Sequence, residues 1–114
     1  MITGAHAIIH SPAADEIRTF LRDVLEFPSV DAGGGWLIFA LPPAELATHP
    51  TDGELRHELY LMCDDLDATI TALHDKGVRT GPVHEERWGT VTTLTLPGGS
   101  ELGLYQPKHP TAHG

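Results

Sequence analysis

One order of secondary-structure elements occurs twice along this chain, with a period of roughly fifty residues. In each half, a strand pattern leads into an amphipathic helix pattern, and further strand patterns follow. Two copies are too few for a solenoid, which needs at least three stacked repeats. The halves must instead bury their open sheets against each other or against a partner chain. This packing predicts an α+β fold in which two βαβββ units form curved mixed sheets around a central cleft, a common place for a small-molecule site.

The first unit is expected to span residues 4–49. Residues 4–10 (Gly-Ala-His-Ala-Ile-Ile-His) have a strand pattern, and Ser11-Pro12 provides an N-cap and a proline for the first helical position. A strongly apolar strand is expected at residues 36–41, after a glycine turn, and a short strand at residues 45–49. Apolar side chains at helical spacing predict the helix between them: Ile17, Phe20, Leu21, Val24 and Leu25.

The second unit is expected to span residues 56–107, after a polar linker at 50–55. A strand at 57–63 precedes a helix that Asp64-Asp65 caps and Lys76-Gly77 ends, with Leu66, Ile70 and Leu73 as its buried stripe. Three strand patterns follow, within residues 78–86, 90–96 and 101–105. Residues 108–114, with His109 and His113, are expected to form a frayed polar tail. The prediction is one domain over residues 1–114.

The composition limits the cell compartments and the classes of binding partner that we expect for this chain. Sixteen acidic and seven basic side chains give a formal net charge of −9, which repels phosphate backbones and argues against nucleic-acid binding. This charge serves solubility, or it marks a cleft that attracts cationic ligands. The single cysteine, Cys63, permits no internal disulfide and is expected to be a packed thiol. No apolar run reaches the length of a membrane span, and we expect a cytoplasmic protein.

Several motifs in this order resemble the vicinal oxygen chelate superfamily of glyoxalases, extradiol dioxygenases and bleomycin-resistance proteins. The run from His6 to Phe27 ends in Phe-Leu-Arg-Asp-Val-Leu-Glu-Phe, which is similar to the family's first strand and helix. The segment Cys63-Asp-Asp-Leu-Asp-Ala, followed by Lys76-Gly-Val, looks like its second helix, and Trp88-Gly with the later Pro97-Gly-Gly resembles its ending. The resemblance covers nearly the whole chain and implies the fold, whereas this fold hosts unrelated chemistries.

Two positions depart from the family pattern. Glu26 stands where the family usually has glycine after the first helix, a position that often needs a positive φ. A non-glycine residue there is expected to cost about 1 kcal/mol. The turn at residues 96–99 (Leu-Pro-Gly-Gly) lacks the family's usual aspartates.

The resemblance also implies positions for a divalent metal such as nickel, zinc, manganese or iron. Metal-dependent members take a His or Glu ligand from the first and last strands of each unit, since these groups suit an ion that keeps open positions for substrate. The first ligand falls on His6 and the next on Glu58, with His57 facing the other way. The last strand offers Gly103, which has no ligating side chain, and the first unit offers Ala47 or Glu45 at its equivalent position.

Strand alternation leaves substitutes for the missing ligands. Glu101 and Tyr105 share the face of Gly103, and Glu45 and His49 share the face of Ala47. The expected site therefore contains His6, Glu58, Glu101 and either Glu45 or His49. Glu101 or Glu45 would act as a ligand or a general base. The alternative for His6 is an ordinary pocket histidine, with His10 on the same face. A buried Glu58 would need a partner or a metal, unless its strand is an edge facing water.

Large apolar side chains are expected to form the walls of the cleft, or simply to belong to the core. We expect a protein that binds a small metabolite or an antibiotic in this cleft and that forms a homodimer. The alternative is a metal-dependent lyase, isomerase or dioxygenase-like enzyme, and a third possibility is a purely associative domain. The wall residues are Trp36, Phe39, Tyr60, Met62, Trp88 and Tyr105.

Overall fold

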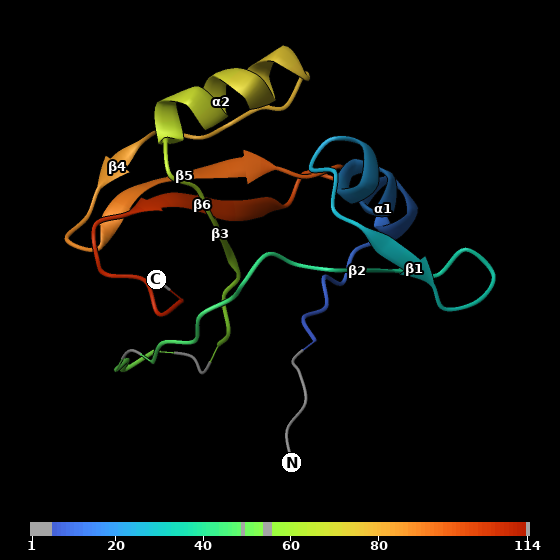
Figure 1. The fold of residues 1–114 in the computed structure, drawn as a ribbon, viewed down its shortest axis with the longest axis horizontal. Helices are drawn as coiled ribbons and strands as arrows, with labels where there is room; N and C mark the ends of the chain where they lie inside the picture. The colour runs from blue at the N-terminus through green and yellow to red at the C-terminus, as the bar shows by residue number, and fades with distance from the viewer. Residues whose placement is uncertain (1–5, 49, 54–55, 114) are drawn as a thin grey trace.

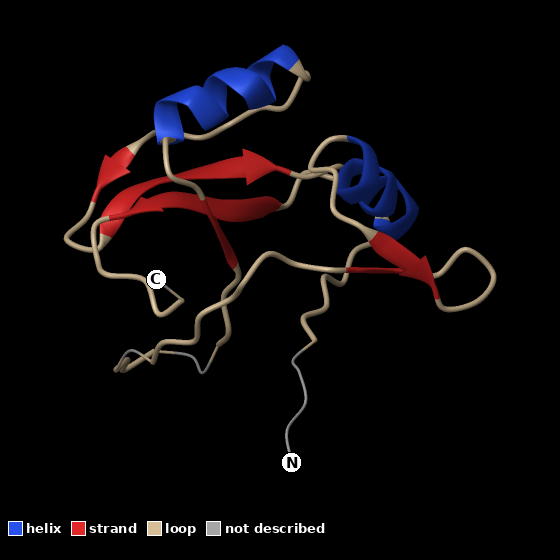
Figure 2. Ribbon diagram, viewed as in Figure 1, coloured by secondary structure: helices blue, strands red, loops and turns tan. Residues whose placement is uncertain are grey.

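The protein is described here by a computed structural model, which places residues 6–48, 50–53 and 56–113. Its elements follow the order α1 (Ala14–Asp23), β1 (Ser29–Asp31), β2 (Leu37–Phe39), β3 (Tyr60–Met62), α2 (Leu66–Asp75), β4 (His84–Glu85), β5 (Gly89–Thr95) and β6 (Glu101–Pro107). Figures 1 and 2 show α2 lying across one face of the larger sheet and α1 beside the end of that sheet. The predicted α+β class is confirmed.

The second unit forms a four-stranded mixed sheet in the order β3-β6-β5-β4. β3 runs parallel to β6, and the remaining neighbours are antiparallel. Leu94, Leu102 and Leu104 alternate onto one face of the sheet, where they join Leu66 and Leu73 of α2 in the buried core. Residues 56–107 therefore contain every element that the sequence predicts for them.

α2 begins and ends at the predicted residues. Asp65 is its N-cap, and its carboxylate accepts a hydrogen bond from the Ala68 N–H at 3.1 Å. The N–H of Leu66 donates to the side-chain oxygen of Gln106 at 2.9 Å, which ties the start of the helix to β6. Gly77 follows the helix with a φ of 80°, a left-handed conformation that glycine adopts without strain.

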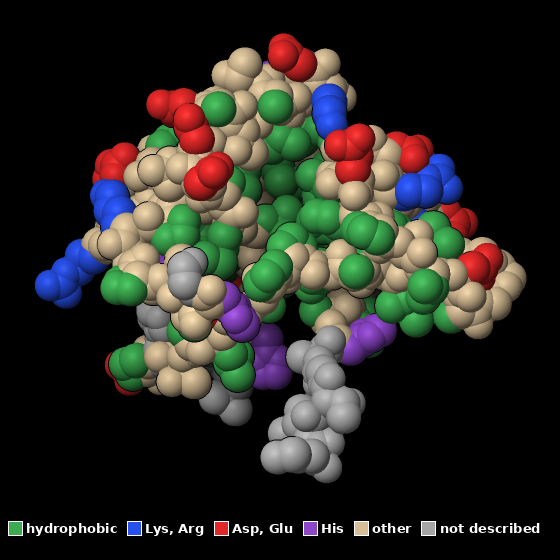
Figure 3. Space-filling view, in the orientation of Figure 1, with side chains coloured by type: hydrophobic (Ala, Val, Ile, Leu, Met, Phe, Trp, Pro, Cys, Tyr) green, Lys and Arg blue, Asp and Glu red, His purple; other side chains and the backbone are tan. Residues whose placement is uncertain are grey.

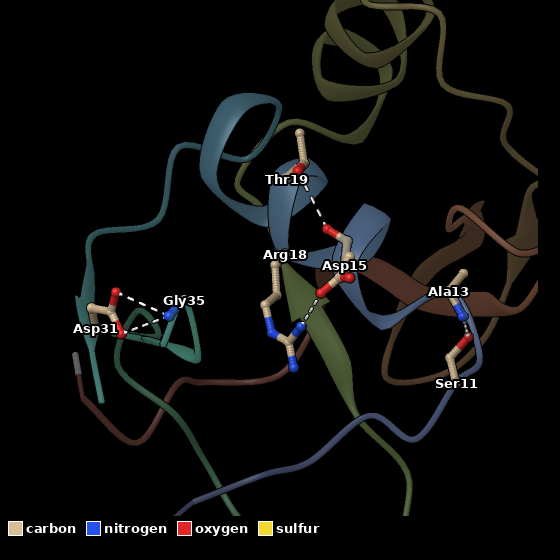
Figure 4. Close-up of polar contacts among 7 residues, drawn as sticks. All are labelled: Ser11, Ala13, Asp15, Arg18, Thr19, Asp31 and Gly35. Atoms are coloured by element: carbon tan, nitrogen blue, oxygen red, sulfur yellow. Dashed lines mark hydrogen bonds and ion pairs between the residues drawn. The ribbon is translucent and has the colours of Figure 1, made fainter. Parts of the chain in front are cut away.

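α1 begins three residues after Ser11. The prediction of Ser11 as N-cap and Pro12 as first helical residue is wrong, because Ala13 is the N-cap and α1 has no side-chain cap. The Ser11 hydroxyl instead accepts a hydrogen bond from the Ala13 N–H at 3.1 Å, within the turn before the helix (Figure 4). Ile17 and Phe20 of the predicted stripe are buried and join the core of the second unit. At the other end of α1, Glu26 has a φ of 59°, as expected from the sequence.

The first unit has a two-stranded antiparallel sheet, β1 with β2, in which Val30 faces Ile38. β1 was not predicted from the sequence. The carboxylate of Asp31 accepts hydrogen bonds from the N–H groups of Gly33 and Gly35, at 2.7 and 3.2 Å, and so closes the glycine turn. Figure 4 shows the contact between Asp31 and Gly35. This local bond stabilises a hairpin that the short Ser-Val-Asp pattern does not reveal.

Two strands expected in the first unit are not formed in the described residues. Residues 6–10 and 44–48 belong to no strand, and His49 lies outside the described residues. Both segments run on the side of the larger sheet opposite to α2 (Figure 1). The reason is visible in the pairing: β2 bonds to β1 on one side and has no second neighbour among the described residues.

The C-terminal tail is held by contacts, in contrast to the frayed segment expected from the sequence. The Lys108 ammonium lies 2.6 Å from a Glu85 carboxylate oxygen, and the Lys108 N–H donates to the Trp88 carbonyl at 2.9 Å. Further along, the Ala112 N–H donates to Glu45 and a His113 ring nitrogen bonds the Ala44 carbonyl. The tail therefore connects the second unit to residues 44 and 45 of the first unit.

None of the helices in the described part of the chain is long and apolar enough to cross a membrane.

Candidate functional site

A cleft of about 820 Å3 lies on the face of the larger sheet opposite to the leucines that pack under α2. Residues 6–10 line one side of the cleft, residues 57–60 line another, and β5 and β6 supply the floor. Histidine side chains gather on this lower part of the molecule in the space-filling view, away from α2 (Figure 3). The cleft thus lies where the two halves of the chain meet.

Strand register determines which side chains face this cleft. Tyr60 pairs with Gly103, and Gly103 pairs with Thr93, so these three residues form one row across the sheet. Because side chains alternate along a strand, this row lies on the face opposite to the leucines that pack under α2. Glu101, two residues before Gly103, shares the row's face. The sequence pattern did not identify Thr93 as a residue that lines the cleft, because its position there depends on its pairing with Gly103 on the next strand.

The ring of Tyr60 lies directly over Gly103. A β-carbon built at Gly103 would lie 2.2 Å from Cδ1 and 2.5 Å from Cε1 of Tyr60, much closer than any real contact. The absence of a side chain at position 103 therefore gives the tyrosine ring its place. Tyr60 remains 38% exposed and lines the cleft.

Trp88 and Tyr105 pack against the edge of this ring. The Tyr60 centroid lies 5.8 Å from that of Trp88 and 5.8 Å from that of Tyr105, in edge-to-face geometry, and the latter two rings are 5.1 Å apart. Such aromatic pairs contribute about 0.5–1.5 kcal/mol beyond the area they bury. The three rings therefore form one rigid aromatic group, and of its members only Tyr60 lines the cleft.

Glu58 lies at the exposed rim of the cleft, two residues before β3. Its carboxylate is 2.8 Å from the guanidinium of Arg56, so its ion partner is a neighbouring side chain. From the sequence, Glu58 was expected to be either buried with a partner or a metal, or placed on an edge strand facing water. The structure shows the side chain exposed to water. Burial, followed by the negative charge of Glu58, raises the pKa of the Tyr60 hydroxyl. A side-chain hydrogen bond with Glu58 raises this pKa further, so the hydroxyl stays protonated at neutral pH.

Three further predicted residues line the same cleft. His6 and His10 come from the N-terminal segment, and Glu101 comes from the start of β6. His57 joins them, on the rim beside Glu58. All four side chains are exposed to water.

The remaining predicted site residues lie outside the cleft lining. Glu45 is bound by the tail, and Trp36 stacks under the guanidinium of Arg18 at 4.6 Å from the ring centroid. Phe39 belongs to β2, on a partly buried face. Met62 of β3 pairs with Tyr105 in the next row of the sheet, where Tyr105 is only 9% exposed. Trp88 and Tyr105 contact the Tyr60 ring edge to face and are not among the residues that line the cleft.

The donors expected for a divalent metal do not converge. His6, Glu58 and Glu101 share one cleft, yet no three His, Cys, Asp or Glu side chains among the described residues are placed to hold an ion. Arg56 already neutralises Glu58, and the Tyr60 ring fills the space above Gly103, the position that the resemblance assigns to a ligand. The described residues, as arranged, therefore do not fit the metal that the fold family implies.

A second, smaller cavity of about 340 Å3 lies between the C-terminal ends of the two helices. Phe20, Val24 and Val78 contribute to its lining, and a hollow with hydrophobic side chains at its base is visible in this region (Figure 3). The Lys76 ammonium at its edge donates a hydrogen bond to the Val24 carbonyl at 2.9 Å. This cation therefore joins the ends of the two helices.

No family model matches the sequence, and no curated protein matches it significantly. Solved structures do match. The antibiotic-binding protein TnmS3 from Streptomyces sp. CB03234 superposes with a TM-score of 0.62 at 25% identity, over 91% of this chain and 100% of that chain. A glyoxalase/bleomycin resistance protein from the same organism gives a TM-score of 0.56 at 26% identity, over 82% of this chain and 90% of that chain.

Lactoylglutathione lyase from Agrobacterium tumefaciens has the same fold. It superposes with a TM-score of 0.66 at 15% identity, over 91% of this chain and 92% of that chain. At this identity the similarity concerns the fold alone. Together, these neighbours confirm the resemblance that the sequence motifs indicated.

Proposed function

Because this chain has the fold of the vicinal oxygen chelate superfamily, we propose that it is a binding protein that holds a small metabolite or antibiotic in its cleft. The observation that carries the proposal is the cleft of about 820 Å3, within the size range of small-molecule sites. Its lining combines one aromatic ring, Tyr60, with the carboxylates of Glu58 and Glu101. The neighbour TnmS3, described as an antibiotic-binding protein, supports a ligand of this kind.

A thermal-shift screen tests this proposal. Tag-free protein treated with EDTA is heated in the presence of a panel of antibiotics and aromatic metabolites. A ligand at about one hundred times its Kd adds about 2.7 kcal/mol to stability, which raises the melting temperature by several degrees. The shift should shrink in Glu58→Gln and Glu101→Gln. The matched control is Glu16→Gln, an exposed charge on α1 outside the cleft. A shift that survives both cleft substitutions would place the ligand elsewhere.

A second candidate is a metal-dependent lyase, isomerase or dioxygenase-like enzyme. One observation favours it, namely that His6, Glu58 and Glu101 line the same cleft. The Tyr60 ring over Gly103 weighs against it. Metal content measured by mass spectrometry on tag-free protein separates the two candidates. About one divalent ion per chain, lost in both His6→Ala and Glu58→Ala, would favour the enzyme.

We also propose that the protein acts as a homodimer in the cytoplasm. The chain exposes 8673 Å2, whereas a folded monomer of 12.3 kDa exposes about 6,100 Å2. Its radius of gyration is 15.1 Å, against about 13 Å for a compact chain of this length. The excess surface is of the size that homodimer interfaces bury. A compartment that keeps thiols reduced suits the one free cysteine, Cys63.

Exposed apolar side chains of the first unit indicate where the second copy would bind. Leu46 is 96% exposed, and Ile8, Val30 and Trp36 are each about two-thirds exposed. Ile8 and Leu46 lie in the segments 6–10 and 44–48, which belong to no strand in the described chain. A strand of the second copy could therefore pair with either segment. Light scattering should give about twice the chain mass. Leu46→Asp should shift the protein towards the monomer, whereas Ala72→Glu on the exposed face of α2 should not. A monomeric mass for the wild type would contradict the dimer.

A further inference from the structure

The smaller cavity, between the C-terminal ends of α1 and α2, has an apolar interior. Phe20, Val78 and Leu96 in its lining are buried members of the hydrophobic core, and Val24 packs against that core. The cavity volume of about 340 Å3 is within the size range of small-molecule sites. An apolar group that enters this cavity would therefore leave water for a surface made of core side chains.

Two basic side chains, Lys76 and Arg79, line the same cavity, and no aspartate or glutamate is among the described residues of its lining. The Lys76 ammonium uses one of its three N–H groups on the Val24 carbonyl, so two remain for a ligand. The Arg79 guanidinium has no ion pair or hydrogen bond within the described part of the chain. Its planar fork matches the two oxygens of a carboxylate.

The distribution of basic side chains over the molecule makes this pair unusual. The chain has seven lysine and arginine residues, and four of them pair with carboxylates in the structure. The other three, Lys76, Arg79 and Arg87, have no carboxylate partner among the described residues. Two of these three line one cavity, which therefore gathers unpaired positive charge in an acidic protein.

The negative groups near the cavity do not cancel this charge. Each helix end contributes about half a negative elementary charge, against two full positive charges. Asp23, the last residue of α1, is bound by Arg22 at 2.7 Å, and Asp75, the last residue of α2, is not among the lining residues. More distant carboxylates are screened by salt beyond about 8 Å. The local potential at the cavity therefore favours an anion.

We propose that this cavity is a second ligand site, which binds an organic anion that carries a short apolar tail. Arg79 and Lys76 bind the carboxylate, and the tail enters the cavity above Phe20. The site is separate from the cleft, so this proposal and the proposed function stand or fall independently. Phe20 belongs to the first unit and the two basic residues belong to the second, so a bound anion contacts both units.

Two compounds with the same tail and opposite charge test the site. Octanoate is the anion and octylammonium is the cation. Isothermal titration calorimetry at low ionic strength should give octanoate a Kd of about 1 mM or lower, and octylammonium should bind at least about tenfold more weakly. The net charge of −9 alone would favour the opposite order. A preference for the anion therefore reports the local charges of the binding site.

Variants of the two basic residues test which charges bind the anion. Arg79→Gln should weaken octanoate binding about fivefold or more, because the amide lacks both the charge and the fork. Lys76→Gln retains an N–H donor for the helix end and should weaken binding in the same direction, and the double variant should lose the preference for the anion. The matched control is Arg87→Gln, an exposed arginine outside the cavity, which should stay within about twofold of wild type. Unchanged melting temperatures would show that the variants are folded.

Backbone amide shifts in two-dimensional NMR locate the bound octanoate. Leu96 lines both the cavity and the cleft, so its amide does not distinguish them. The amides of Val78 and Thr95 should shift, and those of Tyr60 and Gly103 in the cleft should not. Shifts confined to the cleft, equal binding of the two compounds, or equal weakening by Arg87→Gln would overturn the site. Absence of both heat and amide shifts at about 10 mM octanoate, ten times the expected Kd, would also overturn it. None of these results would alter the thermal-shift test of the cleft.

Discussion

The hydroxyl of Tyr105 lies 3.0 Å from Nε2 of His109, and Nδ1 of the same imidazole lies 2.8 Å from the Pro110 carbonyl oxygen. A carbonyl oxygen only accepts, so Nδ1 carries the proton and Nε2 accepts from the tyrosine hydroxyl. The buried end of Tyr105 is therefore joined to the C-terminal tail.

Removing this bond should loosen the tail and lower stability. We expect His109→Ala to reduce the free energy of unfolding by about 1 kcal/mol, the usual net value of one such bond. Tyr105→Phe should cost a similar amount, and the double variant should cost less than the sum, because both changes remove the same bond. Urea unfolding of the four proteins measures this coupling. Additive losses would show that the bond does not hold the tail.

Glu26 should be a site of stored backbone strain. Its φ of 59° is left-handed, and we expect Glu26→Gly to raise the free energy of unfolding by up to about 1 kcal/mol. Glu26→Ala is the control, because alanine removes the carboxylate while keeping the unfavourable β-carbon. Thermal unfolding should show stabilisation by glycine only. Equal stabilisation by both would attribute the effect to the charge.

Gln106 should contribute to the stability of α2 from a neighbouring strand. Its side-chain oxygen accepts from the Leu66 N–H at the start of the helix, in a partly buried position. Gln106→Leu leaves that N–H without its acceptor and should cost about 1–3 kcal/mol. Gln106→Glu keeps an acceptor and should remain close to wild type. Urea unfolding of both variants checks this, and equal losses would assign the effect to packing.

The thiol of Cys63 should react slowly at neutral pH. Burial is the largest cause that raises its pKa, and the charge of Asp64 acts in the same direction, while a hydrogen bond involving Thr69 opposes them. Only the thiolate reacts, so alkylation by iodoacetamide should be slower than for free cysteine and should accelerate above pH 9. Alkylation as fast as that of free cysteine at pH 7 would contradict this environment.

The same shift makes stability depend on pH in a defined direction. The folded protein holds the Cys63 proton more tightly than the unfolded chain does. The contribution is therefore complete below the unfolded pKa and is lost as the pH rises through the folded pKa. Between pH 8 and pH 11, wild type should lose more stability than Cys63→Ala, as measured by urea unfolding at each pH. Parallel curves would show that the thiol is not coupled to folding.

The second unit could be predicted from the sequence because its signals are local. Asp65 caps α2, Gly77 ends it, and the threonine-rich strand β5 precedes the turn at Gly98, so propensity and periodicity agree with the final pairing. In the first unit, the strand patterns at residues 6–10 and 45–48 are equally local. A strand also needs a neighbouring strand to pair with, and no strand pairs with these two segments in the described chain. Strand pairing depends on segments that are far apart in the sequence, and a periodic pattern within one segment does not reveal its partner.

The candidate site could be predicted only in part, for a similar reason. Motif positions placed His6, Glu58, Tyr60 and Glu101 in one cleft. The role of Gly103 was interpreted as the loss of a ligand, whereas the register of β3 with β6 brings the Tyr60 ring over it. Cross-strand contacts of this kind depend on which residues face each other, and sequence spacing within one strand does not determine that.

Native mass spectrometry tests the central claim most directly. Tag-free, EDTA-treated protein is incubated with the compound that stabilises it most in the thermal-shift screen, and the mass of the intact complex is recorded. We expect a dimer that carries one compound per chain and no additional metal mass. A compound that binds only after a divalent metal is added, with the metal lost in His6→Ala and Glu58→Ala, would contradict the account.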